Sequence, residues 1–279
     1  MCSSDLSITQ IAFAGLGSVL YRMIAKNWQR EKIIFVLNVF ILFLIQPTSS
    51  IRYLNFLLPW VMIFLLMGSG FAVAKTEKKE VLTLLLLCLI GFLPFLLPEI
   101  IPALTTSFLD IHLNGQILLK LLCLGGIVLG ISYLVRQKKG FLPFILVVVL
   151  LMFLLLKQPT LTTIASRSLR GMFQQNTDLA SALDIRWIGY SYIAFRLIHV
   201  IREYQKGRIR DISFIRFMNY CLFFPAVTAG PINRYDDFTK QMDEPEVSIQ
   251  DGFLEGGKRL FTGLFKKFVI AYSIAVLAL

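Results

Sequence analysis

Residues 141–156 read FLPFILVVVLLMFLLL, a run of 16 residues without one polar side chain. The length of this run is close to the roughly 20 apolar residues that a helix needs to cross the hydrocarbon core of a bilayer. The whole chain has the same character, because 56% of its 279 residues are hydrophobic, only 16% are charged and its mean hydropathy is +0.71. Soluble domains carry about 25% charged residues. The sequence therefore predicts an all-α, polytopic transmembrane protein.

Other apolar stretches flank this run on both sides, and we expect about eight or nine spans in all. The candidate spans cover residues 6–21, 33–45, 53–74, 81–97, 117–135, 141–156, 185–201 and 212–229, with a ninth that starts near residue 260. Proline and glycine interrupt several of them. Lipid tolerates such breaks only where protein or a cavity satisfies the freed backbone groups.

Basic residues divide the loops into two alternating sets. Loops 22–32, 75–80, 136–140 and 202–211 hold 14 Lys and Arg, whereas the loops between them hold 4. Cytoplasmic loops are enriched in Lys and Arg, so the first set is predicted to be cytoplasmic and the N-terminus external. The same rule explains the net charge of +11 without nucleic acid as a partner.

The segment 157–184 is too polar to cross a membrane. Five of its apolar residues fall near helical spacing: Leu161, Ile164, Ala165, Leu169 and Met172. This pattern fits a helix that lies along the membrane interface. An ordinary external loop fits the segment equally well.

Common metal and nucleotide motifs are missing from the sequence. The four cysteines have no CxxC spacing, and His112 and His199 form no HExxH or HxxxH pattern. Walker loops and GxGxxG turns are also absent from the chain. We therefore expect no metal site and no bound cofactor.

Charged residues enter the predicted spans in the second half of the chain. Arg196 and His199 are three residues apart, so they share one helix face, with Tyr192 one turn before Arg196. One interpretation is that they form the polar wall of a substrate tunnel, since ionisable groups inside a membrane usually face a cavity or a partner. The other is that both snorkel toward the basic end at Arg202.

The segment 219–241 reads NYCLFFPAVTAGPINRYDDFTKQ. Pro225 and the Gly230–Pro231 pair are predicted to break a helix at membrane depth, with Asn233 and Arg234 directly beyond them. Irregular backbone at that depth indicates a water-accessible cavity. A simple loop at the exit of a span has the same composition.

Three ordered sequence blocks lie between residues 187 and 271. The central block has Phe224-Pro225, then Ala229-Gly230-Pro231-Ile232, then Arg234 and Phe238. It resembles the pattern FPxxxAGPIxRxxxF of the membrane-bound O-acyltransferase (MBOAT) family. Upstream, WIGYSYIAFRLIHVIREYQKG (187–207) resembles a family helix with a basic exit. Downstream, GGKRLFTGLFKKFVIA (256–271) resembles the family's GLFKK segment. The branch that these blocks resemble contains alginate O-acetyltransferases and teichoic-acid D-alanyl transferases.

The resemblance implies an activity and a location. Such enzymes enclose a polar tunnel in a bacterial plasma membrane. They move an acyl group from a thioester donor, either an acyl-CoA or an acyl-carrier protein, to a hydroxyl of an envelope polysaccharide or another acceptor, often with accessory envelope proteins. The implied motif or tunnel residues here are Arg196, His199, Pro225, Gly230, Pro231, Asn233 and Arg234. Residues 181–279 would form the start of the family's core, and residues 1–180 would contribute helices with little motif signal.

The chain departs from the family pattern at its catalytic histidine. In the family this residue follows the GLFKK block by several dozen positions, and this chain ends at Leu279. Neither His112 nor His199 has that motif context, so no catalytic residue is assigned. We expect the chain to be an N-terminal fragment of a longer protein that is inactive by itself. The alternative function is a secondary transporter or lipid flippase that binds its substrate at the broken helix.

Overall fold

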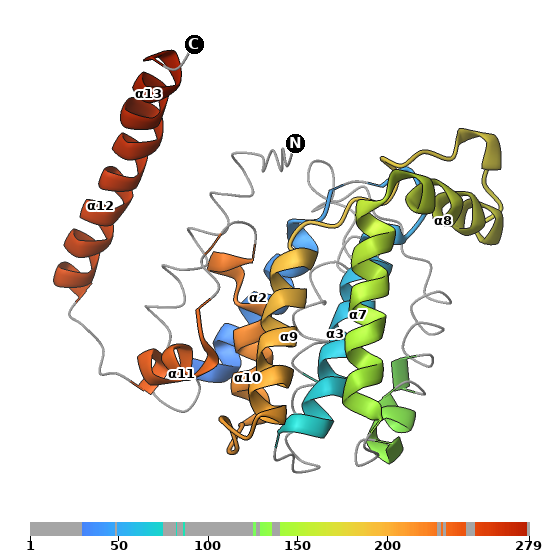
Figure 1. Ribbon diagram of the computed structural model, residues 1–279, viewed down its shortest axis with the longest axis horizontal. Coiled ribbons are helices and arrows are strands. Elements are labelled where there is room, and N and C mark those ends of the chain that lie inside the picture. The colour runs from blue at the N-terminus through green and yellow to red at the C-terminus, as the bar shows by residue number, and fades with distance from the viewer. Residues whose placement is uncertain are drawn as a thin grey trace, which may run out of the picture. The chain divides into compact units, whose positions relative to one another are not determined.

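The computed structural model describes residues 30–47, 49–74, 82, 86, 125–126, 129–135, 140–227, 230, 233–243 and 249–277. The elements of this part of the chain are helices (Figure 1). Contacts divide the chain into two units, Met1–Asp236 and Asp237–Leu279. The described helices of the first unit are α2 (Arg30–Leu44), α3 (Leu54–Val73), α7 (Phe141–Lys157), α8 (Pro159–Met172), α9 (Tyr190–Gln205) and α10 (Phe214–Leu222), with short 3₁₀ turns at Thr177–Leu179 and Phe224–Ala226.

Three of the stretches predicted from hydropathy are helices in the structure. Stretches 33–45, 53–74 and 141–156 coincide with α2, α3 and α7. In the described residues no single helix is both long and apolar enough to count as a candidate span. The pair α7 and α8 meets that criterion together, with a bend of 96° between them, and Leu57–Val73 is a shorter apolar helix. The predicted span 6–21, nearly all of 81–97 and most of 117–135 lie outside the described residues.

Two predicted spans are shorter helices than expected. The stretch 185–201 becomes helical only at Tyr190, because Gly189 has a φ of +85° that a right-handed helix does not allow. The stretch 212–229 is helical only from Phe214 to Leu222 and then breaks. Pro225 explains that break, since a proline disfavours helical backbone in the residue before it and lacks an N–H.

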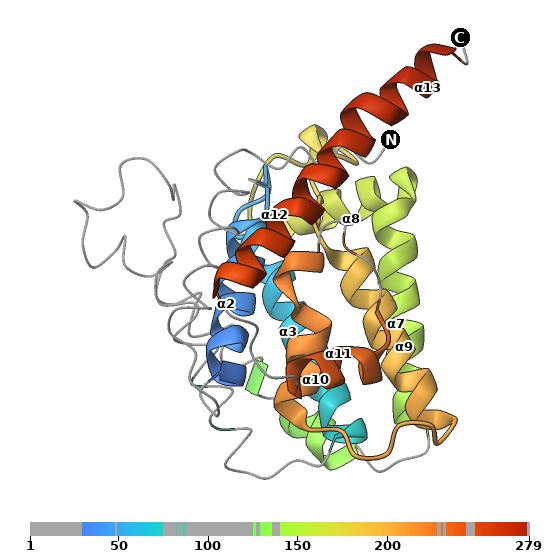
Figure 2. The same cartoon turned by 90° about the vertical axis from the view of Figure 1, so that its left-hand side faces the viewer.

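The centre of the first unit is α10. It packs against α2, α3 and α9, which run beside it in both views (Figure 1, Figure 2). Phe214, Phe217 and Tyr220 are fully buried there. The Phe214 ring stacks on Phe71 of α3, with centroids 5.4 Å apart. Aromatic side chains of this kind contribute a large part of a core's apolar area.

The remaining elements lie toward the C-terminal end of the chain. Helix α11 (Tyr235–Asp243) begins at the end of the first unit. The second unit contains one continuous helix, made of α12 (Ile249–Phe265), a π-helical turn (Lys266–Ile270) and α13 (Ala271–Leu277). It starts earlier than the ninth span predicted near residue 260. Single π-helical turns are rare and often mark functional positions, and this one falls on the GLFKK block.

Candidate functional site: a capped helix break

The chain leaves helical geometry just after α10, at Phe223. Phe223 has φ −49° and ψ 102°, and the next three residues form a single 3₁₀ turn around Pro225. A break of this kind frees backbone carbonyls at the end of one helix and N–H groups at the start of the next turn. Two polar side chains from other helices, Arg196 and Asn38, bind these freed groups.

Arg196 of α9 caps the carbonyl side of the break. Its Nη1 donates to the carbonyl oxygens of Tyr220 at 3.3 Å and Phe223 at 3.4 Å, and its Nη2 donates to that of Ala226 at 3.3 Å. The residue is only 3% exposed. A helix C-terminus carries a partial negative charge of about half an elementary charge, which a cation stabilises. Backbone dipoles therefore take the place of a carboxylate partner for this guanidinium.

Asn38 of α2 caps the donor side of the break. Its Oδ1 accepts from the Phe224 N–H at 2.9 Å, and its Nδ2 donates to Asn219 Oδ1 at 3.1 Å. Asn219 in turn donates to the backbone oxygen of Glu31 at 2.8 Å. The Glu31 carboxylate pairs with Arg216 of α10 at 2.8 Å. Asn38 and Asn219 are both fully buried, so these polar groups are satisfied by the protein itself.

Two tyrosines connect the break to the segment beyond it. The Tyr220 hydroxyl donates to the backbone oxygen of Asn233 at 2.7 Å. The Tyr235 ring packs edge-on against Tyr220 with centroids 5.4 Å apart, and the Arg196 guanidinium lies 5.8 Å from the Tyr220 ring centroid. Within the described residues, the buried Tyr235 hydroxyl and Arg196 Nε have no hydrogen-bond partner. They are the polar atoms here that a substrate could still engage.

Glycine is required where the backbone comes closest to the break. A Cβ on Gly230 would lie 2.2 Å from Ala226 Cβ and 2.3 Å from its Cα, far inside contact distance. The Gly230 N–H donates to the Ala226 oxygen, the same atom that Arg196 caps. Gly189 combines its positive φ with a close approach to Val227, where an added Cβ would lie 3.0 Å from Cγ2.

The predicted site residues are distributed unevenly around the break. Arg196 is buried and points into it, which differs from a side chain that snorkels outward. His199 is half-buried with its ring centroid 6.4 Å from that of Tyr220. Pro225, Asn233 and Arg234 are exposed. Pro231 and His112 lie outside the described residues, and a tunnel role for any of this set stays a prediction.

Sequence reasoning missed Asn38, Asn219 and the two tyrosines. Asn38 did carry a signal, because it is the one polar side chain in an otherwise apolar stretch, 33–45. A lone polar residue in such a stretch usually has a specific partner. The identity of that partner, 186 residues away at Phe224, could not be read from spacing.

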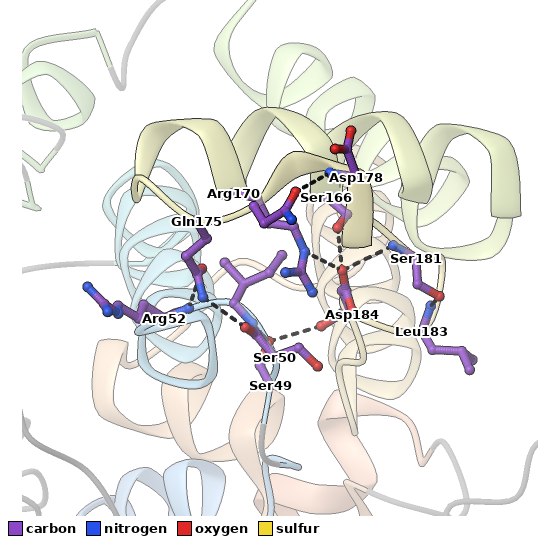
Figure 3. Close-up of polar contacts among 12 residues, drawn as sticks. Ser49, Ser50, Arg52, Ser166, Arg170, Gln175, Asp178, Ser181, Leu183 and Asp184 are labelled. Atoms are coloured by element: carbon purple, nitrogen blue, oxygen red, sulfur yellow. Dashed lines mark hydrogen bonds and ion pairs between the residues drawn. The ribbon is translucent and has the colours of Figure 1, made fainter.

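A second buried polar cluster lies between α8 and the segment before α9 (Figure 3). The Asp184 Oδ2 accepts from Arg170 Nε at 2.8 Å, from Ser166 Oγ at 2.6 Å and from the Ser181 N–H at 3.1 Å. Burial alone would raise the pKa of Asp184. The hydrogen bonds from Arg170, Ser166 and Ser181 outweigh burial and hold that pKa below its ordinary value. The three donors to this carboxylate lie within 18 residues of Asp184 in the chain, which indicates a structural role.

Metal-ligand chemistry was not predicted from the sequence. In the part of the chain that the structure describes, His, Cys, Asp and Glu side chains nowhere gather in groups of three or more. Cys221 is a free thiol, fully buried in α10.

Comparison with known families identifies the class of protein to which this chain belongs. The family profile of the membrane-bound O-acyltransferases matches residues 100–279, which include α9, the break and the GLFKK helix. The chain belongs to the MBOAT, membrane-bound O-acyltransferase family. It is accordingly a membrane protein.

The chain is similar to bacterial transferases and acetylases, and it spans less than a quarter of the length of each relative named here. It is 34% identical over 94 residues to a teichoic acid D-alanyltransferase of Lacticaseibacillus rhamnosus, an alignment that covers 33% of this chain and 23% of the relative. It is 32% identical over 95 residues to the enzyme of the same name from Bacillus subtilis, covering 32% and 24%. A probable alginate O-acetylase AlgI of Pseudomonas aeruginosa is 33% identical over 92 residues, covering 33% and 18%. No solved structure matches the chain.

Proposed function

We propose that this chain belongs to an enzyme that transfers an acyl group from a thioester donor to a hydroxyl of a cell-envelope polymer or lipid. The observation that carries the proposal is the family match over residues 100–279, together with relatives named for D-alanylation and O-acetylation. Acyl-CoA and acyl-carrier protein are the candidate donors. Polysaccharides and teichoic acids are the candidate acceptors, and accessory envelope proteins are candidate partners.

The geometry of the break supports a role in substrate positioning. The Phe224–Pro225 and Gly230 portions of the family motif sit on backbone that Arg196 and Asn38 hold in one arrangement. Rigid placement of polar groups is what acyl transfer requires, since a misplacement of about 1 Å can cost 10²-fold in rate. In this proposal the Arg196 Nε–H and the Tyr235 hydroxyl form hydrogen bonds with polar atoms of the substrate.

The general base is not assigned to either histidine of this chain. Acyl transfer to a hydroxyl requires removal of its proton as the new bond forms, and a placed base contributes about 10² to 10⁴ in rate. His199 has no motif context, and its ring lies beside Tyr220 near the basic end of α9. We expect the family's histidine, in a segment beyond the GLFKK block, to fill this role.

The experiment is a thioester-consumption assay of the full-length protein in detergent with candidate acceptors. Arg234→Ala is expected to reduce acyl transfer more than it reduces thermal stability, and His199→Ala is expected to retain turnover. Arg202→Ala, an exposed position on the same helix as His199, is the matched control. Substrate uptake into vesicles without thioester consumption would favour the transporter alternative. Turnover that disappears in His199→Ala would contradict the assignment of the base.

We further propose a multi-pass arrangement in the bacterial plasma membrane with loop 202–211 in the cytoplasm. The proposal rests on the basic residues of that loop, among them Lys206, Arg208 and Arg210. Lys206→Cys should react with an impermeant maleimide only after the cells are opened. Labelling of Lys206→Cys in intact cells would overturn this topology.

A further inference from the structure

Helix α8 has an inverted distribution of polarity. A helix on the surface of a soluble protein buries its apolar stripe and exposes its polar one. In α8 the buried residues are Thr162, Ser166 and Arg170, four residues apart on one face. Leu161 is 44% exposed, Ile164 59% and Met172 77%, and these three lie on the opposite side. The polar stripe therefore faces the protein.

The polar stripe is held inward by specific bonds. Ser166 and Arg170 both donate to the Asp184 carboxylate (Figure 3), and Thr162 Oγ1 donates to the Leu155 oxygen of α7 at 2.6 Å. On the same side, Ala165 and Leu169 pack on the apolar cluster of Ile51, Leu54 and Ile185. Rolling α8 to bury its outward face would break the Arg170–Asp184 pair, so the outward orientation is fixed.

The outward face of α8 is suited to hydrocarbon rather than to water. We define it as Leu161, Ile164, Ser168, Gly171 and Met172, all of them exposed. Its one side-chain hydroxyl, on Ser168, already donates to the Ile164 oxygen at 3.1 Å. A polar group satisfied within its own helix can enter lipid at little cost. Exposed Arg167 flanks this face, where its long stem would let the charge reach lipid headgroups.

The bend between α7 and α8 gives the outward face a defined place relative to a bilayer. Helix α7 exposes Phe144, Val147, Leu150, Leu151 and Leu154, each more than half exposed. Its 17 residues span about 25 Å, close to the thickness of a hydrocarbon core. With α7 along the membrane normal, a bend of 96° lays α8 in the membrane plane (Figure 1). Large exposed apolar side chains then lie on both helices of the bend, up to Leu154 on α7 and from Leu161 on α8.

We propose that α8 is an in-plane membrane helix whose outward face binds the acyl chains of one leaflet at its headgroup boundary. The occupant is lipid, because α7, which joins α8 at the bend, also exposes large apolar side chains, and the chain is of a membrane-bound family. The buried Arg170–Asp184 pair acts as the anchor that keeps the helix rolled outward. This inference concerns the lipid surface and holds whichever acyl donor the enzyme uses.

Spin-label accessibility in vesicles tests the proposal with the full-length protein. Cys2, Cys88 and Cys123 are replaced by alanine, and Cys221 is fully buried and stays. Labels are placed at Ile164→Cys and Met172→Cys, with Arg202→Cys at the exposed basic end of α9 as the control. Ile164 and Met172 are exposed, so these substitutions leave the packing intact. Each label is tested against oxygen, which concentrates in lipid, and a nickel chelate, which stays in water.

The expected result is that oxygen relaxes the labels at positions 164 and 172 more than the nickel chelate does, with the reverse order at position 202. Stronger relaxation by nickel at both α8 positions would place the face in water and overturn the proposal. Weak relaxation by both reagents at 164 and 172 would mean that protein covers the face, which also overturns it. Asp184→Asn provides a second reading, because loss of the anchor should reduce the oxygen preference at both positions.

Discussion

Two arginines in this molecule are buried to nearly the same extent, but different groups stabilise their charges. Arg170 is 5% exposed and meets the Asp184 carboxylate, 14 residues away, at 2.8 Å. Arg196 is 3% exposed and meets three backbone carbonyls, 24 to 30 residues away. The first pair anchors a helix to its neighbouring segment, and the second holds a broken helix in shape. A buried cation can thus be stabilised by a helix end as well as by an acid.

The largest effect is expected from Arg196→Met in the full-length protein. The substitution removes the charged donor of the carbonyls of Tyr220, Phe223 and Ala226, although those of Phe223 and Ala226 each keep one backbone N–H donor. Hydrogen bonds to a charged group contribute about 1.5–3 kcal/mol each. We expect the free energy of unfolding to fall by about 3 kcal/mol or more, measured as the largest drop in Tm of this series. Arg196→Lys keeps the charge without the fork of donors and should fall between wild type and Arg196→Met.

The control for Arg196 is Arg202→Met, which removes an exposed arginine from the same helix. It should change Tm little, since exposed charges contribute less than about 1 kcal/mol. Equal Tm values for Arg196→Met and Arg202→Met would show that the carbonyl cap contributes nothing.

Asp184→Asn should have the next largest effect, about 2–3 kcal/mol, because it leaves the Arg170 guanidinium buried without a charge partner. The double variant Arg170→Met/Asp184→Asn should be more stable than Asp184→Asn alone, since it removes the uncompensated charge. Thermal unfolding of the four members of this cycle measures the coupling. Additive losses would mean that the pair is not coupled. No comparable rescue exists for Arg196, because its partners belong to the backbone.

The sequence predicted the positions of the helices better than the contacts of the two buried arginines. Residues 141–156 predicted α7 because every position is apolar, and Pro225 correctly predicted the break after α10. Spacing also placed Arg196 and His199 on one face of α9. The helix starts and ends were less accurate, since local backbone at Gly189 and Phe223 shortens α9 and α10.

The partners of the site residues could not be predicted, for a physical reason. Arg196 binds carbonyl oxygens, which every residue carries, so no residue type marks its partners. The Asp184 carboxylate accepts a hydrogen bond from the Ser181 N–H within a turn, and such a turn leaves no periodic pattern in the sequence. Tertiary packing, not local pattern, brings these groups together. The same packing buries Arg196 and leaves Arg234 exposed, although the resemblance implied both as tunnel or motif residues.

Asn38→Leu tests the donor side of the break and should cost about 1–3 kcal/mol. The substitution removes the acceptor of the Phe224 N–H and one partner of Asn219, both buried. Asn233→Leu, at an exposed position beyond the break, is the matched control. Thermal unfolding of both variants measures the difference. If Asn38→Leu is as stable as the control, the donor side needs no cap and the break depends on Arg196 alone.

The smallest effect expected is a difference in pH dependence between the two arginine sites. Hydrogen bonds from Arg170, Ser166 and Ser181 outweigh burial and hold the pKa of Asp184 below its ordinary value of 3.8. A carboxyl group with a lowered folded-state pKa stabilises the protein above its unfolded pKa, and this contribution is lost as pH falls through the folded value. The Tm gap between wild type and Asp184→Asn should therefore be constant from pH 7 to about pH 5 and shrink below pH 4. Arginine stays protonated throughout this range, so the gap between wild type and Arg196→Met should not change.

Thermal unfolding of the three proteins across this pH range measures both gaps. An Asp184→Asn gap that persists as pH falls to the lowest value at which wild type still folds would mean that the neutral carboxyl binds Arg170 as well as the carboxylate does.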